Sequence, residues 1–92
     1  MECKEIEGYE NYLIYPDGSV WSKNKGRFLK PRKLGSYLGF NLCKNGETKN
    51  HYIHRLVAQT FLDNPNNLPE VNHIDENKFN NDVSNLEWVT RM

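Results

Sequence analysis

The chain has 92 residues, of which 37% are hydrophobic and 12% aromatic, so it can form one small domain whose aromatic rings supply much of the core. No apolar run reaches the length of a transmembrane helix, and the N-terminus has no signal-peptide pattern. Cys3 and Cys43 are too far apart to form a C-x-x-C zinc motif. The sequence therefore predicts a soluble cytoplasmic protein with two reduced thiols.

The formal net charge is zero, but the charges are unevenly distributed along the chain. Residues 1–17 contain five acidic side chains and one basic side chain, residues 18–55 contain nine basic and one acidic, and residues 56–92 contain six acidic and two basic. A basic middle segment suits a polyanion as a partner, and the acidic C-terminal segment suits a cation. A solvated surface of mixed charge would produce the same pattern.

The first half of the chain reads as short strands joined by turns. A hairpin is expected over residues 12–22, because Pro16-Asp17-Gly18 is a turn signal between two apolar runs. A short strand over 27–30 is stopped by the following proline. A second hairpin is expected over 37–53, since Asn45-Gly46 is the sequence most typical of a two-residue hairpin turn.

The second half begins with a change of period. Apolar residues at helical spacing predict a short helix over 54–62, followed by a loop rich in Asn and Pro over 63–70. Residues 71–73 read as a short extended piece, 74–84 as a polar loop, and 85–90 as another strand.

These elements predict an α+β fold in a single small domain over residues 1–92. Its β-rich part, residues 1–53, is expected to form a small antiparallel sheet of about four or five strands. The part over 54–92 is expected to contain the one central helix and a C-terminal pair of strands.

The chemistry-bearing residues lie in the polar loop and in the strand after it. His73 stands between Asn72 and a run of Asp and Asn residues that extends to Asn81. Imidazole can accept a proton from water near neutral pH, and the neighbouring carboxylate and amide oxygens suit a hard cation such as Mg²⁺. A loop held by Asx turns, with His73 as an ordinary capping or core residue, would show the same composition.

The spacing of these residues resembles that of the HNH homing endonucleases of phages and their introns. The strings V-N-H-I-D-E-N-K-F-N-N over residues 71–81 and N-L-E-W-V-T over 85–90 carry the resemblance, and His54-Arg55-Leu56-Val57-Ala58 is similar to the helix entry of that family. Residues 5–42 resemble the nuclease-associated modular domain that often precedes the motif. The residues that carry this second likeness are Ile6 to Tyr9, Tyr12, Asp17-Gly18, Val20 to Ser22, Leu29-Lys30 and Tyr37.

The resemblance implies a ββα-metal site, in which two strands and a helix hold one divalent cation against the scissile phosphate of DNA. By position, His73 matches the general base, Asn72 a metal ligand, and Asn85 the residue that braces the loop. The implied cofactor is Mg²⁺ or Mn²⁺. The side chains expected to contact nucleic-acid phosphates are Lys23, Lys25, Arg27, Lys30, Arg32 and Lys33.

Two features depart from the family pattern. Asn72 stands where many relatives carry Asp, and a neutral amide binds Mg²⁺ less well than a carboxylate does. Only Arg91 and Met92 follow Thr90, so the helix that supplies the last metal ligand has no counterpart, and a two-stranded remnant of the motif is expected. We therefore expect cleavage to be weakened or lost.

Two further expectations follow from these departures. The apolar side chains of the remnant, Leu86, Trp88 and Val89, would need another cover, which predicts a homodimer. The chain could instead be a non-catalytic, HNH-derived binding protein of phage origin, acting as an inhibitor of a host defence protein or as a sponge for a nucleotide signal. If the chain is phage-encoded, its location is the host cell cytoplasm.

Overall fold

The computed structural model describes residues 2–91; the terminal methionines, Met1 and Met92, lie outside the described part. It contains nine strands, one α-helix and one 3₁₀ turn, which confirms the α+β class. In chain order the elements are β1 (Lys4–Ile6), β2 (Tyr9–Ile14), β3 (Val20–Ser22), β4 (Arg27–Phe28), β5 (Arg32–Leu34), β6 (Tyr37–Lys44), β7 (Glu47–Tyr52), α1 (Ile53–Phe61), β8 (Glu70–His73), η1 (Val83–Asn85) and β9 (Leu86–Val89).

All strand pairs are antiparallel, and they form three separate sheets: β1-β2-β3-β4, β5-β6-β7 and β8-β9. The sequence predicted one small sheet in the N-terminal part, and the structure divides that part between two. The division falls at Pro31. Leu29 N still donates to Val20 O at 2.9 Å, but proline has no N–H with which to continue the ladder. The short strands β1 and β5 were not expected from the sequence.

Both predicted hairpins are confirmed. Strand β2 pairs with β3 in the register Ile14↔Val20, and β6 pairs with β7 in the register Lys44↔Glu47. The second register leaves a two-residue turn at Asn45 and Gly46, whose φ angles are 53° and 81°. Positive φ at both central residues defines a type I′ turn, whose twist matches that of the flanking strands.

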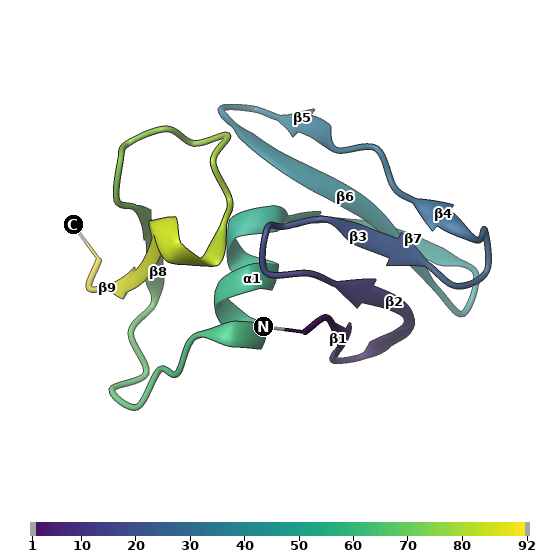
Figure 1. The fold of residues 1–92 in the computed structure, drawn as a ribbon, viewed down its shortest axis with the longest axis horizontal. Helices are drawn as coiled ribbons and strands as arrows, with labels where there is room; N and C mark the ends of the chain where they lie inside the picture. Colours follow the sequence, from purple (N-terminus) through teal and green to yellow (C-terminus); the bar gives the residue numbers. More distant parts are fainter. Residues whose placement is uncertain (1, 92) are drawn as a thin grey trace.

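The predicted helix is confirmed to within one residue at each end. It lies between the larger sheets and the β8–β9 hairpin (Figure 1), and it contacts strands on both sides. Ile53, Leu56 and Val57 turn its apolar face into a core shared with Phe40 and Leu86. Within residues 2–91 no helix has the length and apolar character needed to cross a membrane.

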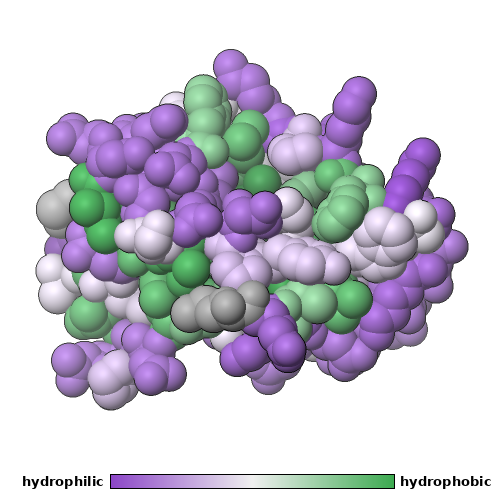
Figure 2. Space-filling model, viewed as in Figure 1, coloured by the Kyte–Doolittle hydropathy of each residue, from purple (hydrophilic) through white to green (hydrophobic). Residues whose placement is uncertain are grey.

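Packing of the β8–β9 hairpin differs from the expectation of an uncovered apolar side. Leu86 is only 4% exposed and belongs to the core, and Trp88 is half-buried and donates Nε1–H to Leu62 O at 3.3 Å. On the side of the molecule seen in Figure 2, hydrophobic residues form groups with hydrophilic residues between them. The chain's own helix therefore covers Leu86, and this residue gives no reason to expect a dimer.

Candidate active site

His73 is the last residue of β8 and pairs with Leu86 of β9. Its side chain is 5% exposed and faces the first turn of α1, where its ring centroid lies 5.0 Å from that of His54. The ring of Tyr37, the first residue of β6, lies 4.8 Å from His54 and 6.0 Å from His73. Three segments far apart in the sequence thus meet around the imidazole of His73.

Asn81 fixes the orientation of His73. Oδ1 of Asn81 lies 2.8 Å from Nε2 of His73, and both side chains are buried. An amide oxygen only accepts hydrogen bonds, so Nε2 carries the proton and Nδ1 carries the lone pair. Within residues 2–91, Nδ1 of His54 is the one buried side-chain nitrogen or oxygen that lacks a partner, so Nδ1 of His73 is not among the buried atoms without a partner. The hydrogen bond to Asn81 therefore orients the ring and leaves Nδ1 as its basic nitrogen.

The turn between β2 and β3 forms a wall behind Asn81. Gly18 has φ +92°, and a Cβ at this position would lie 3.3 Å from Cβ of Asn81 and 3.0 Å from Cγ2 of Ile53. In the same turn, Pro16 O accepts a hydrogen bond from Val83 N at 2.8 Å. Glycine therefore allows both the left-handed turn and its close approach to the loop that carries Asn81.

Asn85 is the last residue of η1, directly after the polar loop, and is 7% exposed. Its Oδ1 accepts from Asp75 N at 3.0 Å, and its Nδ2 donates to Asp75 Oδ1 and to Asn80 O, both at 2.9 Å. Hydrogen bonds from the Asn80 side chain, the Asn77 backbone and the Asn85 side chain hold the pKa of Asp75 below its usual value. This network places Asn85 where a brace of the loop would lie.

His54 is buried without a hydrogen bond at Nδ1. Burial, followed by the neighbouring His73 and Arg55, lowers its pKa to about 4. His54 is therefore neutral at pH 7 and presents an uncharged ring to His73.

Asn72 lies next to His73 and directly opposite Glu87 in the β8–β9 register. Its Nδ2 donates to Glu87 Oε2 at 2.9 Å, and in the described part of the chain Oδ1 of Asn72 stays free of hydrogen bonds. An amide oxygen beside a carboxylate fits part of the shell of Mg²⁺ or Mn²⁺, ions that complete their coordination with water and phosphate oxygens. Residues 2–91 contain no group of three or more His, Cys, Asp or Glu side chains that could hold a metal alone.

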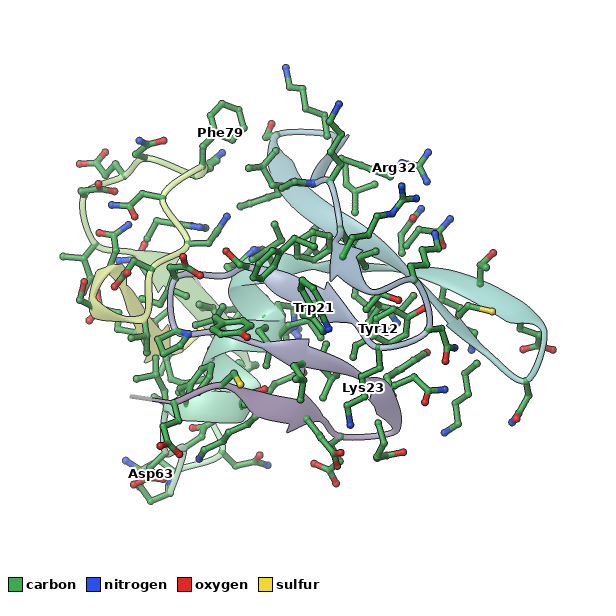
Figure 3. The ribbon with its side chains drawn as sticks, turned by 45° about the vertical axis from the view of Figure 1, so that its right-hand side comes forward. Tyr12, Trp21, Lys23, Arg32, Asp63 and Phe79 are labelled. Atoms are coloured by element: carbon green, nitrogen blue, oxygen red, sulfur yellow. The ribbon has the colours of Figure 1, made fainter. Side chains whose placement is uncertain are left out.

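The six basic residues singled out in the sequence are not all in one place. Four of them, which we call the basic strip, line a cavity of about 500 Å³ with Phe28 and Phe40: Lys25, Arg27, Lys30 and Arg32. Lys33 instead lies over the Phe79 ring, 5.9 Å from its centroid, and Lys23 forms an ion pair with Glu5 at 2.6 Å. Arg32 and Phe79 lie toward the same edge of the molecule, and Lys23 lies away from them (Figure 3).

Comparison with known proteins finds no matching family model. The chain is 50% identical over 86 residues to an uncharacterised HNH endonuclease of Acanthamoeba polyphaga mimivirus, matching 92% of this chain and 26% of that protein. It is 40% identical over 93 residues to the DNA endonuclease I-HmuI of Bacillus phage SP01, matching 99% of this chain and 53% of that protein. The solved structure of I-HmuI, an HNH homing endonuclease that binds and cleaves DNA, matches 98% of this chain with a TM-score of 0.89 and 41% identity. This chain belongs to the HNH endonuclease family.

This chain matches only part of its relatives: it spans about a quarter of the mimiviral protein and about half of I-HmuI. Its structure brings His73, Asn72 and Asn85 together at the β8–β9 hairpin and sets the basic strip apart from them. Asn81, Glu87 and the contact of Tyr37 with the site could not be identified from the sequence. Only the paired asparagines, Asn80-Asn81, gave a signal, and it did not indicate which of the two faces His73.

Proposed function

We propose that this chain binds DNA and, with Mg²⁺ or Mn²⁺, hydrolyses a phosphodiester bond, with His73 as the general base. The observation that carries the proposal is the hydrogen bond between His73 Nε2 and Asn81 Oδ1. It leaves the lone pair on Nδ1, the nitrogen that can take a proton from an attacking water.

Each polar residue around His73 has a distinct part in this proposal. Nδ1 of His73 accepts the proton of the attacking water, and Asn81 Oδ1 continues to accept from Nε2 as the imidazolium forms. Asn85 holds the loop that carries Asn81 through its bonds to Asp75 and Asn80. The neutral ring of His54 avoids a second positive charge beside the imidazolium.

Asn72 would hold the cation through its free Oδ1. When bound, a divalent cation stabilises negative charge on the phosphate and on the leaving oxygen. Because the amide is neutral, we expect the cation to bind less tightly than with a carboxylate at this position, and cleavage to be correspondingly weaker.

The basic strip and Lys33 are proposed to contact DNA phosphates, which supply most of the sequence-independent affinity. Lys33 lies over Phe79 in the polar loop, so phosphate contacts on this side would lead toward His73. Lys23 is expected to contribute less, because Glu5 already neutralises it.

The first test is nicking of supercoiled plasmid in Mn²⁺. We expect cleavage by the wild-type chain and a loss of about 10²–10⁴-fold in rate in His73→Ala, the usual contribution of a general base. His51→Ala is the control, because His51 lies on β7 and bonds Tyr9 Oη rather than any residue of the site. Equal rates in the wild type and His73→Ala would contradict the role of His73.

A second function is favoured by the neutral side chain of Asn72: binding of DNA without cleavage. In that case the wild type would leave the plasmid intact in both Mg²⁺ and Mn²⁺ but bind DNA with an affinity that falls steeply with salt. Binding that ignores salt, or no binding to DNA, would point instead to a protein or nucleotide target.

A further inference from the structure

The β8–β9 hairpin carries a side-chain pair whose second member has no part in the function proposed above. Asn72 of β8 and Glu87 of β9 are directly opposite each other, and the Asn72 amide donates to Glu87 Oε2 at 2.9 Å. Glu87 is exposed and Asn72 is half-exposed, so solvent ions can reach both.

The hydrogen bond decides which atom of Asn72 faces an incoming ion. Glu87 can only accept, so the donor must be Nδ2 of Asn72, and within residues 2–91 the Asn72 Oδ1 forms no hydrogen bond of its own. Without Glu87, the amide could equally present its NH₂ group, which repels cations.

The charge of Glu87 is not neutralised within the hairpin. Among residues 2–91 no ion pair involves Glu87, whereas Glu70 of the same hairpin lies 4.0 Å from both Arg55 and Arg91. The partner of Glu87 is a neutral amide, so a full negative charge remains beside the free oxygen of Asn72.

We infer that Asn72 and Glu87 act as one divalent-cation site, in which Asn72 Oδ1 and the Glu87 carboxylate are both ligands and Glu87 supplies the negative charge. Two oxygen ligands suit an ion that keeps several waters and binds substrate phosphate. The inference deepens the proposed function, on which the choice of Mg²⁺ or Mn²⁺ rests.

The pair also accounts for the amide at position 72. A carboxylate there would face the Glu87 carboxylate directly across the strands, and like charges in this arrangement destabilise a sheet. The amide avoids that repulsion in the free protein and keeps one negative charge in the site.

The test is Mn²⁺ binding to the full chain without DNA, followed by the loss of the free-ion electron paramagnetic resonance signal. Glu87→Gln keeps a hydrogen-bond acceptor for Asn72 and removes the charge, so we expect binding about tenfold weaker or worse. Glu70→Gln, in the same hairpin but already paired with arginines, is the matched control and should bind as the wild type does. Circular dichroism would verify that each variant is folded.

A charge-relocation variant separates the ligand role from a purely structural one. Asn72→Asp combined with Glu87→Gln moves the carboxylate across the strands and should restore Mn²⁺ binding to near the wild-type level. Wild-type affinity in Glu87→Gln, or no Mn²⁺ binding by the wild type at millimolar concentration, would overturn the inference. If Mn²⁺ binding follows the expected pattern but plasmid is not nicked, the proposed hydrolysis fails and the inference stands.

Discussion

A single hydrogen bond sets the chemistry of the buried histidine. Because Asn81 can offer only its carbonyl oxygen to Nε2 of His73 in the observed orientation, the imidazole is held as the tautomer with a basic Nδ1. The neighbouring rings of His54 and Tyr37 pack against it but form no hydrogen bond with it within residues 2–91. Selection of the tautomer therefore depends on Asn81.

We expect nitrogen-15 NMR to find His73 protonated at Nε2 in the wild type. In Asn81→Ala the buried Nε2–H loses its partner, so the tautomers should mix and nicking should slow by about tenfold or more. Asn80→Ala is the control, because the Asn80 side chain bonds Asp75 and not His73. An unchanged tautomer in Asn81→Ala would contradict the assignment.

His54 predicts a pH dependence of stability. Its pKa in the folded chain is about 4, below the ordinary 6.5, so the unfolded chain binds a proton first as pH falls. Stability is therefore retained above about pH 7 and lost between about pH 6.5 and pH 4, by up to about 3 kcal/mol.

His54→Phe removes this titration and keeps an aromatic ring in place. In urea unfolding we expect the free energy of unfolding to fall less between pH 7 and pH 4.5 in the variant than in the wild type. All carboxylates are present in both proteins, so their contribution cancels. Parallel curves would show that His54 is not buried in neutral form.

The residues of the candidate site could be predicted from the sequence only where their spacing matched a known motif. The V-N-H and N-L-E-W-V-T strings indicated His73, Asn72 and Asn85. The contact of Asn81 with His73 depends on how the polar loop folds over the β2–β3 turn, and that packing leaves no local pattern in the sequence. The position of Glu87 opposite Asn72 depends on a strand register that the sequence alone left open.

At the scale of elements, the hairpins and the helix were predictable because their signals are local. The Asn45-Gly46 turn and the apolar period of α1 each lie within one stretch of chain. Strands β1 and β5 were not, because they are three residues each and exist only through pairing with longer partners. The division into two sheets likewise depends on the direction that the chain takes after Pro31, which no local pattern indicates.

The β2–β3 turn offers a test of how one element supports another. Gly18 and Gly26 both have positive φ, but a Cβ at Gly26 meets nothing within 4 Å. Alanine at either position strains the backbone by about 1–2 kcal/mol. Gly18→Ala also crowds Ile53 and Asn81, so we expect it to cost about 1–3 kcal/mol more than Gly26→Ala in urea unfolding and to slow nicking as well. Equal losses would mean that the turn does not support Asn81.

At the scale of the whole molecule, the net charge is zero, but basic and acidic side chains lie in different parts of the chain. The basic strip lies on the strands and connections of residues 25–32, while the polar loop and the β8–β9 hairpin carry most of the C-terminal acidic residues. DNA binding is therefore expected to be local to the basic strip and strongly dependent on salt.

A matched pair of lysine variants tests this arrangement. Lys30→Gln should reduce the slope of log affinity for duplex DNA against log salt by about 0.9, the value for one phosphate contact. Lys23→Gln should change the slope much less, because Lys23 is already paired with Glu5. Equal changes of the slope in the two variants would mean that DNA does not bind selectively at the basic strip. Light scattering of the same samples would test the homodimer that the sequence predicted and that the burial of Leu86 does not call for.

The burial of Leu86 in the common core has a consequence for protein engineering. Leu86 belongs to the same buried core as Ile14 and Phe40, and Gly18 lies against Asn81, so the nuclease motif is built on residues from the first half of the chain. We expect a graft of residues 70–89 alone onto another scaffold to lose the orientation of His73. The smallest transplantable unit would begin at β1 and end at β9.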